Sequence, residues 1–391
     1  MQLTSLRSLH MLTSTLIAAT CLTVGCDSDS LDAAPGGTGG EEYALDDLDH
    51  ADYVGPEVEP AEPHQVIEND DGTLIAEGSD FRVRIHRSRR VAELNVSRDH
   101  LSQWYGLPFS RWSPEATARL YEVFADDFDF IVFVPASEGQ HPAITNDGDS
   151  VRVRNDVEGL GLSLFDHTQL FGSEGRLQHA VMLGGIKHVV GGPSLRELGE
   201  RWGNAFLPSA SVDHFGFADV GGQLGGCSPD QIEPLGDNQY FCDFDGTTNW
   251  SPDGATHNDR IYARLELYLM GLVSPAGIPA ISWADDAQWV DQEHGIFEGS
   301  LRSATMDELV QDHGARFPRH DESQRHFRTL FVVVSGGDLI DMEMFNSFDL
   351  RVREFAAPKP VINSVPGMYN FFEAASGLAK LDAEDLDASL L

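Results

Sequence analysis

The most informative stretch of this 391-residue sequence is Pro193-Ser194-Leu195-Arg196-Glu197-Leu198-Gly199-Glu200-Arg201-Trp202-Gly203. Ser194 followed three residues later by Glu197 is the pattern of a capping box, in which each side chain satisfies a backbone N–H of the first turn. We therefore expect a helix to begin at Ser194. Arg196 and Glu200 then lie one turn apart on one face, where such an ion pair contributes about 0.2–0.5 kcal/mol. A charged, solvated helix face explains this pattern most simply.

The sequence before this helix predicts strands and helices in one layer. Residues 80–86 alternate between polar and apolar side chains, as a strand does. Ser113 precedes a proline that suits the first position of a helix over residues 114–124. Residues 129–134 form a short apolar run rich in β-branched side chains, typical of a central strand. The order of strand, helix and strand indicates an α+β fold.

The sequence after this helix predicts further buried elements. Residues 261–272 are apolar nearly all round and are closed by a glycine, which indicates a buried helix with a glycine stop. Residues 327–334 suit a helix or a core strand equally, because periodicity alone does not separate the two. Residues 368–378 predict a last helix, and the acidic tail at 382–391 is expected to fray.

The N-terminus has the features of an export signal. Arg7 precedes an apolar run over residues 11–24 that is too short to span a membrane stably, so residues 1–25 predict a signal peptide. The ending Leu22-Thr23-Val24-Gly25-Cys26 resembles a bacterial lipoprotein signal, with Thr23 where leucine is usual. The resemblance implies that Cys26 is lipidated and that the protein sits in the bacterial cell envelope, membrane-anchored in the periplasm or on the cell surface. Ordinary signal cleavage near this point is the alternative.

Residues 26–79 predict a disordered acidic linker behind which the folded part begins. This segment contains no Lys or Arg, and one sign of charge with few large apolar residues cannot offset the entropy of ordering. Residues 80–391 are expected to form a single domain, or one domain of two lobes. The formal charge of -37 excludes a nucleic-acid partner and leaves the lipid as the contact with the membrane.

Two cysteines and one acidic loop remain to be interpreted. Cys227 and Cys242 lie in a loop-rich stretch, and in an oxidising compartment they predict one disulfide, with two free buried thiols as the alternative. Residues 243–249 place oxygen side chains at alternate positions around a glycine, as calcium loops do. They lack the closing Glu of such loops, and Asp-Gly is also a common turn.

Several motifs in order along the chain resemble one family. The central helix is similar to the metal-binding helix of secreted bacterial zincin-type metallopeptidases, which reads His-Glu-x-Gly-His-Arg-Trp and is followed by a His-Trp step, a Gly-Gly loop and a Leu-Tyr-Leu-Met-Gly-Leu helix. The matching residues are Glu197, Gly199, Arg201 and Trp202, then His214-Phe215, Gly221-Gly222, Gly225-Gly226 and residues 267–272. The resemblance covers roughly residues 81–378.

The resemblance implies a zincin-like α+β domain that cuts peptide bonds with zinc-activated water. Glu197 then stands at the general-base position and His214 at the third-ligand position. Arg196 and Glu200 stand where the family has its two zinc-binding histidines. Because an arginine cannot ligate a metal and repels one, the motif Arg196-Glu197-Leu198-Gly199-Glu200 is a degenerate metal motif.

Three functions are consistent with this sequence. The first is a lipid-anchored pseudopeptidase that binds a polypeptide or an envelope protein without cutting it and needs no metal. The second is an active peptidase whose zinc is held by Glu197, Glu200 and His214 with Asp213 or Asp219. The third is a structural surface lipoprotein. Without a metal, Glu197 has no activated water to act on, so we favour the first.

Overall fold

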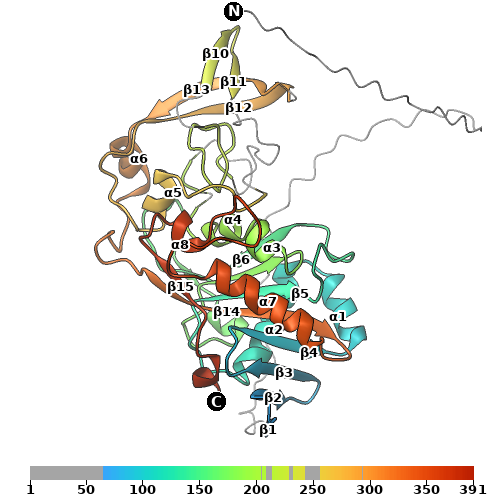
Figure 1. Ribbon diagram of the computed structural model, residues 1–391. Coiled ribbons are helices and arrows are strands. Elements are labelled where there is room, and N and C mark those ends of the chain that lie inside the picture. Colours follow the sequence, from blue (N-terminus) through green and yellow to red (C-terminus); the bar gives the residue numbers. More distant parts are fainter. Residues whose placement is uncertain (1–64, 204, 208–213, 229–231, 243–255, 293) are drawn as a thin grey trace, which may run out of the picture. The chain divides into compact units, whose positions relative to one another are not determined.

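The computed structural model describes residues 65–203, 205–207, 214–228, 232–242, 256–292 and 294–391 (Figure 1). The predicted signal peptide, Cys26 and the predicted calcium loop at 243–249 lie outside the described residues, as does most of the predicted linker. All described residues belong to one compact unit of the chain, Gly40–Leu391.

A mixed sheet, nine-stranded within the described residues, is the largest element. Its central strands run parallel, since β14 pairs with β4 and β5, and β5 pairs with β9. Antiparallel strands flank them on both sides. The strand order is β1 (Gln65–Glu68), β2 (Thr73–Glu77), β3 (Phe81–His86), β4 (Val91–Val96), β14 (His326–Gly336), β5 (Phe130–Pro135), β9 (His179–Leu183) and β6 (Gly148–Arg152), with β15 (Lys380–Asp382) also on β14. The predicted α+β class is confirmed at this level, and residues 327–334 are strand.

Helices cover both faces of this sheet. Along β5, Phe130, Val132 and Val134 belong to one apolar cluster, while Ile131 and Phe133 belong to another, because successive side chains of a strand point to opposite faces. Burial on both faces is why the central strands read as continuous apolar runs. The first cluster includes side chains of α3 (His188–Gly191), α4 (Ser194–Gly199), α5 (Arg264–Leu269), α6 (Met306–His313), α7 (Met342–Phe355) and α8 (Phe371–Ala374), and the second those of α1 (Arg98–Tyr105) and α2 (Phe109–Tyr121).

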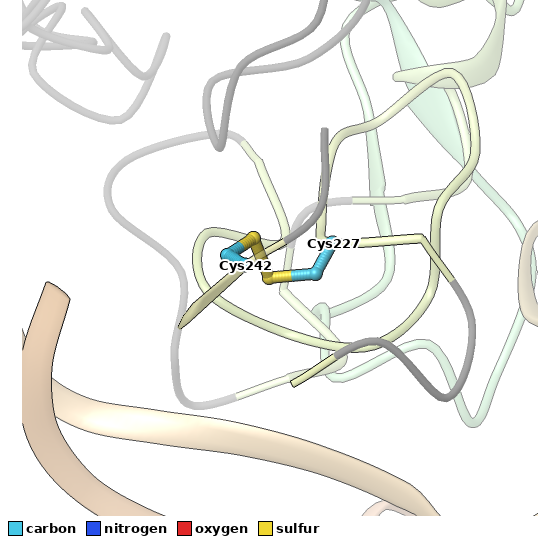
Figure 2. The surroundings of a disulfide bond; sticks show 2 residues. All are labelled: Cys227 and Cys242. Carbon is cyan, nitrogen blue, oxygen red and sulfur yellow. A yellow bond between two sulfur atoms is a disulfide. The ribbon is translucent and has the colours of Figure 1, made fainter. Parts of the chain in front are cut away.

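A smaller four-stranded sheet has its own core and a disulfide. Its order is β10 (Ile232–Gly236), β11 (Gln239–Cys242), β13 (Ile296–Ala304) and β12 (Ile281–Asp291). Cys227 and Cys242 are joined by a disulfide with their Cα atoms 5.4 Å apart (Figure 2). Both cysteines pack with Ala284 and Phe297, so the bridge ties the loop that follows the central helix to this sheet. A two-stranded ribbon and two 3-10 helices complete the described elements: β7 (Arg154–Asn155), β8 (Phe165–Asp166), Thr168–Phe171 and Leu386–Ser389.

The folded part begins earlier than the predicted boundary at residue 80. β1 and β2 lie inside the predicted linker, and β2 pairs antiparallel with β3. Leu74 and Ala76 are buried by this pairing. The acidic composition of the segment concealed them, because burial against a neighbouring strand is not visible in local composition.

Three predicted helix boundaries were wrong. The helix expected over 114–124 is α2, which begins at Phe109 and contains Pro114 in its interior. The lost backbone bond at Pro114 is offset by aromatic packing, since Phe109 and Trp112 are both buried with ring centroids 5.0 Å apart. The helices expected over 261–272 and 368–378 are shorter and are observed as α5 and α8, although Gly271 ends its helix with a φ of 76° as predicted.

The C-terminal tail is ordered, which corrects the expectation that it frays. β15 pairs with β14, and Leu386 is buried. Arg328 donates hydrogen bonds to Glu384 O and Asp385 O, which fixes the backbone between these elements. A helix long and apolar enough to cross a bilayer does not occur among the described residues.

Candidate functional site

The central helix, α4, is held firmly at its N-terminal end. Leu195 and Leu198 are buried in the larger apolar cluster. Ser194 Oγ donates to His188 O at 2.8 Å and Val189 O at 2.7 Å. Asn258 Oδ1 accepts from Leu195 N at 2.9 Å. The polar face of α4 is therefore presented from a rigid support.

The expected capping box is not formed. The N-cap position is Pro193, which makes no side-chain cap, and the Ser194 hydroxyl is used by the preceding turn. The Glu197 carboxylate contacts Arg196 instead of a backbone N–H. The helix thus starts where the sequence predicts, but both side chains of the predicted box have other partners.

Arg196 lies between the two glutamates of the motif. Its Nη2 atom is 2.5 Å and its Nε atom 3.1 Å from Glu197 Oε1. The same Nε atom is 3.7 Å from Glu200 Oε1. Only 15% of the Arg196 side chain is exposed, against 2% for Glu197 and 13% for Glu200. One guanidinium thus serves two carboxylates with little access to water.

Glu200 is the most heavily contacted group of the cluster. Ser150 Oγ on β6 donates to its Oε2 atom at 2.6 Å. His214 Nε2 lies 3.4 Å from Oε1, which is within ion-pair distance although the geometry is not that of a hydrogen bond. Arg152 Nε donates to the Glu200 backbone oxygen at 2.7 Å. β6 therefore fixes the end of α4 from the side.

Glu197 is fully enclosed. A Cβ atom at Gly148 would lie 2.4 Å from Glu197 Oε1, so β6 approaches this closely only because a glycine stands there. His179 on β9 donates through Nε2 to the Glu197 backbone oxygen at 2.8 Å, since a carbonyl accepts only. Burial lowers the pKa of His179 to about 3, so the ring is neutral.

The two glutamates have opposite pKa shifts. Burial, together with the charge of Glu200, raises the pKa of Glu197 to about 8. Burial also acts to raise the pKa of Glu200, but His214, Arg196 and Ser150 outweigh it and lower that pKa to about 2. On β6, burial and the nearby Glu200 raise the pKa of Asp149 to about 6. At neutral pH Glu200 carries the charge that faces Arg196, and Glu197 retains its proton, so it does not act as a base.

The donor set does not fit zinc. Arg196 has no lone pair to offer, and its guanidinium faces the Oε1 atoms of both glutamates. Asp219 accepts a hydrogen bond from Ser282 N at 2.7 Å, in a link to β12, and Asp213 lies outside the described residues. Within the described ranges, three His, Cys, Asp or Glu side chains nowhere group so that they could hold a metal ion.

The structure brings most of the predicted site residues together. Arg196, Glu197, Glu200 and His214 form one cluster, as expected from helical spacing and from the position of His214. The contribution of β6 was missed, because Gly148-Asp149-Ser150 follows an Asn-Asp pair and has the composition of a turn. No known protein family, curated protein or solved structure was found to match the chain.

Proposed function

We propose that this chain is a zincin-like pseudopeptidase, exported and anchored by a lipid at Cys26, that binds an extended polypeptide of the bacterial envelope without cutting it. The observation that carries the proposal is the Arg196 guanidinium, which lies against Glu197 and Glu200 at the ligand positions of the motif. A fixed cation there replaces the charge of a metal. It supplies neither a bound water of lowered pKa nor a Lewis acid, so hydrolysis lacks its reagent.

The edge of the main sheet supports a polypeptide as the ligand. β6 pairs with β9 on one side and is the last strand of the described sheet on that side. An edge strand offers unpaired backbone N–H and C=O groups to an added strand, with adjacent side chains giving specificity. Asp149 and Ser150 lie on this strand beside the cluster. An extended chain added to β6 therefore meets the charged cluster.

Two measurements on the purified protein test this proposal. We expect a fluorescently labelled, unfolded casein to remain uncut during prolonged incubation, with or without a chelator. We also expect a photoreactive amino acid in place of Asp149 to crosslink to the casein. The matched control places the same photoreactive group at Val66 on β1, the opposite edge of the sheet, where we expect no crosslink.

Two results would count against the proposal. Cleavage that the chelator abolishes would indicate a working metallopeptidase with another ligand set. Equal crosslinking, or none, from both sheet edges would remove the polypeptide site and leave a structural role.

A further inference from the structure

A small cavity lies beyond the C-terminal end of α4, apart from the Arg196 cluster. Its volume is about 70 Å³. It has a polar side and an apolar side, and the residues that matter to its chemistry are Asp156, Gln178, Trp202, Met270, Arg316 and Phe327. Since one water molecule needs about 10–15 Å³ of such volume, the cavity has room for about five non-hydrogen atoms.

Arg316 supplies a buried cation to the cavity wall. Only 7% of this residue is exposed. Its Nε atom donates to Leu269 O at 2.8 Å, and Nη1 donates to Pro318 O and to Ser323 Oγ. These partners are neutral oxygens, and within the described residues Nη2 has no hydrogen-bond partner. Buried arginines are rarely left without an anion, so this guanidinium can still bind one.

The one carboxylate on the cavity wall is already engaged by other arginines. Asp156 Oδ1 lies 2.9 Å from Arg201 Nη2, and its Oδ2 lies 3.1 Å from Arg154 Nη2. Burial lowers the pKa of Arg316 to about 10, which still leaves the side chain charged at neutral pH. The cavity is therefore locally cationic, although the whole chain carries a formal charge of -37.

We propose that this cavity binds a short aliphatic carboxylate, with the carboxylate on Arg316 Nη2 and the carbon chain against Trp202, Phe327 and Met270. These three side chains are 3%, 1% and 2% exposed, so they form a dry apolar wall. A guanidinium with a free donor recognises a carboxylate by a charge-assisted hydrogen bond. The size of the cavity selects acetate or propionate, or the chain end of a peptide.

The test is titration of propionate into the full-length protein, followed by calorimetry or by ligand-observed NMR. Propionamide, which has the same shape without the charge, is the matched ligand. We expect propionate to bind at least tenfold more tightly than propionamide, and bulky benzoate not to bind. Equal binding of propionate and propionamide, or binding of benzoate as tightly as propionate, would overturn the proposal.

Variants link this binding to the cavity. Arg316→Gln is expected to weaken propionate binding at least tenfold. Arg325→Gln is the control, because Arg325 also donates to backbone oxygens, those of Leu378, Leu272 and His320, but does not line the cavity. If Arg316→Gln does not fold, Gln324→Glu replaces it, since a carboxylate at this exposed rim position should repel the ligand by a similar factor. Unchanged binding in the folded variant contradicts the proposed site.

The same titration separates two sources of the carboxylate. A short peptide ending in a free carboxylate and the same peptide with an amidated end are compared with propionate. Tighter binding of the free-ended peptide identifies a polypeptide terminus as the ligand. Binding of propionate alone identifies a free short-chain acid. The proposal fails if none of these carboxylates binds.

Discussion

Arg196→Met is expected to lower the free energy of unfolding by about 3–5 kcal/mol, the usual cost of removing one partner of a buried ion pair. Arg196 is the cation that faces Glu197 and Glu200, and Glu200 has a pKa of about 2 and therefore stays ionised at neutral pH. Without the guanidinium, that charge is enclosed with Ser150 and His214 as its remaining side-chain partners. Urea unfolding at pH 7 measures the loss.

Two further variants show whether the loss comes from charge pairing. Arg196→Met combined with Glu200→Gln removes both charges, so we expect it to recover at least half of the lost stability. Arg98→Met is the control, since Arg98 is 77% exposed and its contact with Asp338 is 3.6 Å long, and surface changes of this kind stay within about 0.5 kcal/mol. A loss at Arg196 no larger than that at Arg98 would show that the cluster does not need its cation.

Stability is expected to fall by about 3 kcal/mol between pH 4.5 and pH 7 because of Glu266 alone, at 1.36 kcal/mol for each unit of pKa shift. Glu266 is 2% exposed and accepts hydrogen bonds from Leu224 N at 2.5 Å and Ala263 N at 2.6 Å. Burial raises its pKa to about 7 from the model-compound value of 4.5. A raised carboxyl pKa means that the folded state holds the proton more tightly. The stabilisation is therefore complete below pH 4.5 and is lost as the pH rises through 7.

Glu266→Gln isolates this contribution. The amide has one acceptor oxygen for two backbone donors, so at pH 4.5 we expect the variant to be less stable by about 1–3 kcal/mol. The difference should narrow as the pH rises to 8, because only the wild type acquires a buried charge. Urea unfolding at pH 4.5, 6 and 8 follows both proteins, and parallel curves would contradict the assignment. Glu308→Gln is the comparison of opposite sign, since hydrogen bonds from Thr305 lower the pKa of Glu308 and its stabilisation is lost as the pH falls.

The central strands could be predicted because local sequence determines them. Residues 129–134 form an unbroken apolar run, and the structure buries all of β5 between two helical layers. Residues 327–334 could not be assigned from the same kind of run, since a buried helix and a buried strand have similar composition over eight residues. The partner strands β4 and β5 on either side decide the outcome.

The candidate site was predictable in part for the same reason. Helical spacing places Arg196 and Glu200 on one face, and His214 does lie against Glu200 as its sequence position suggested. The contact of Glu197 with Gly148 and that of Glu200 with Ser150 could not be foreseen, because they depend on β6 pairing with β9. Non-local pairing also explains why β1 and β2 were assigned to the linker.

Whether Arg196 stands in place of a metal is tested most directly by the zinc content of the purified protein. Elemental analysis after exposure to zinc and dialysis is carried out on the native chain and on the variant Arg196→His with Glu200→His. We expect far less than one zinc per native chain and close to one per variant chain, since the variant adds two imidazoles one turn apart near His214. Near-equimolar zinc in the native protein would contradict the replacement of the metal by arginine and would make the alternative ligand set the next object of study.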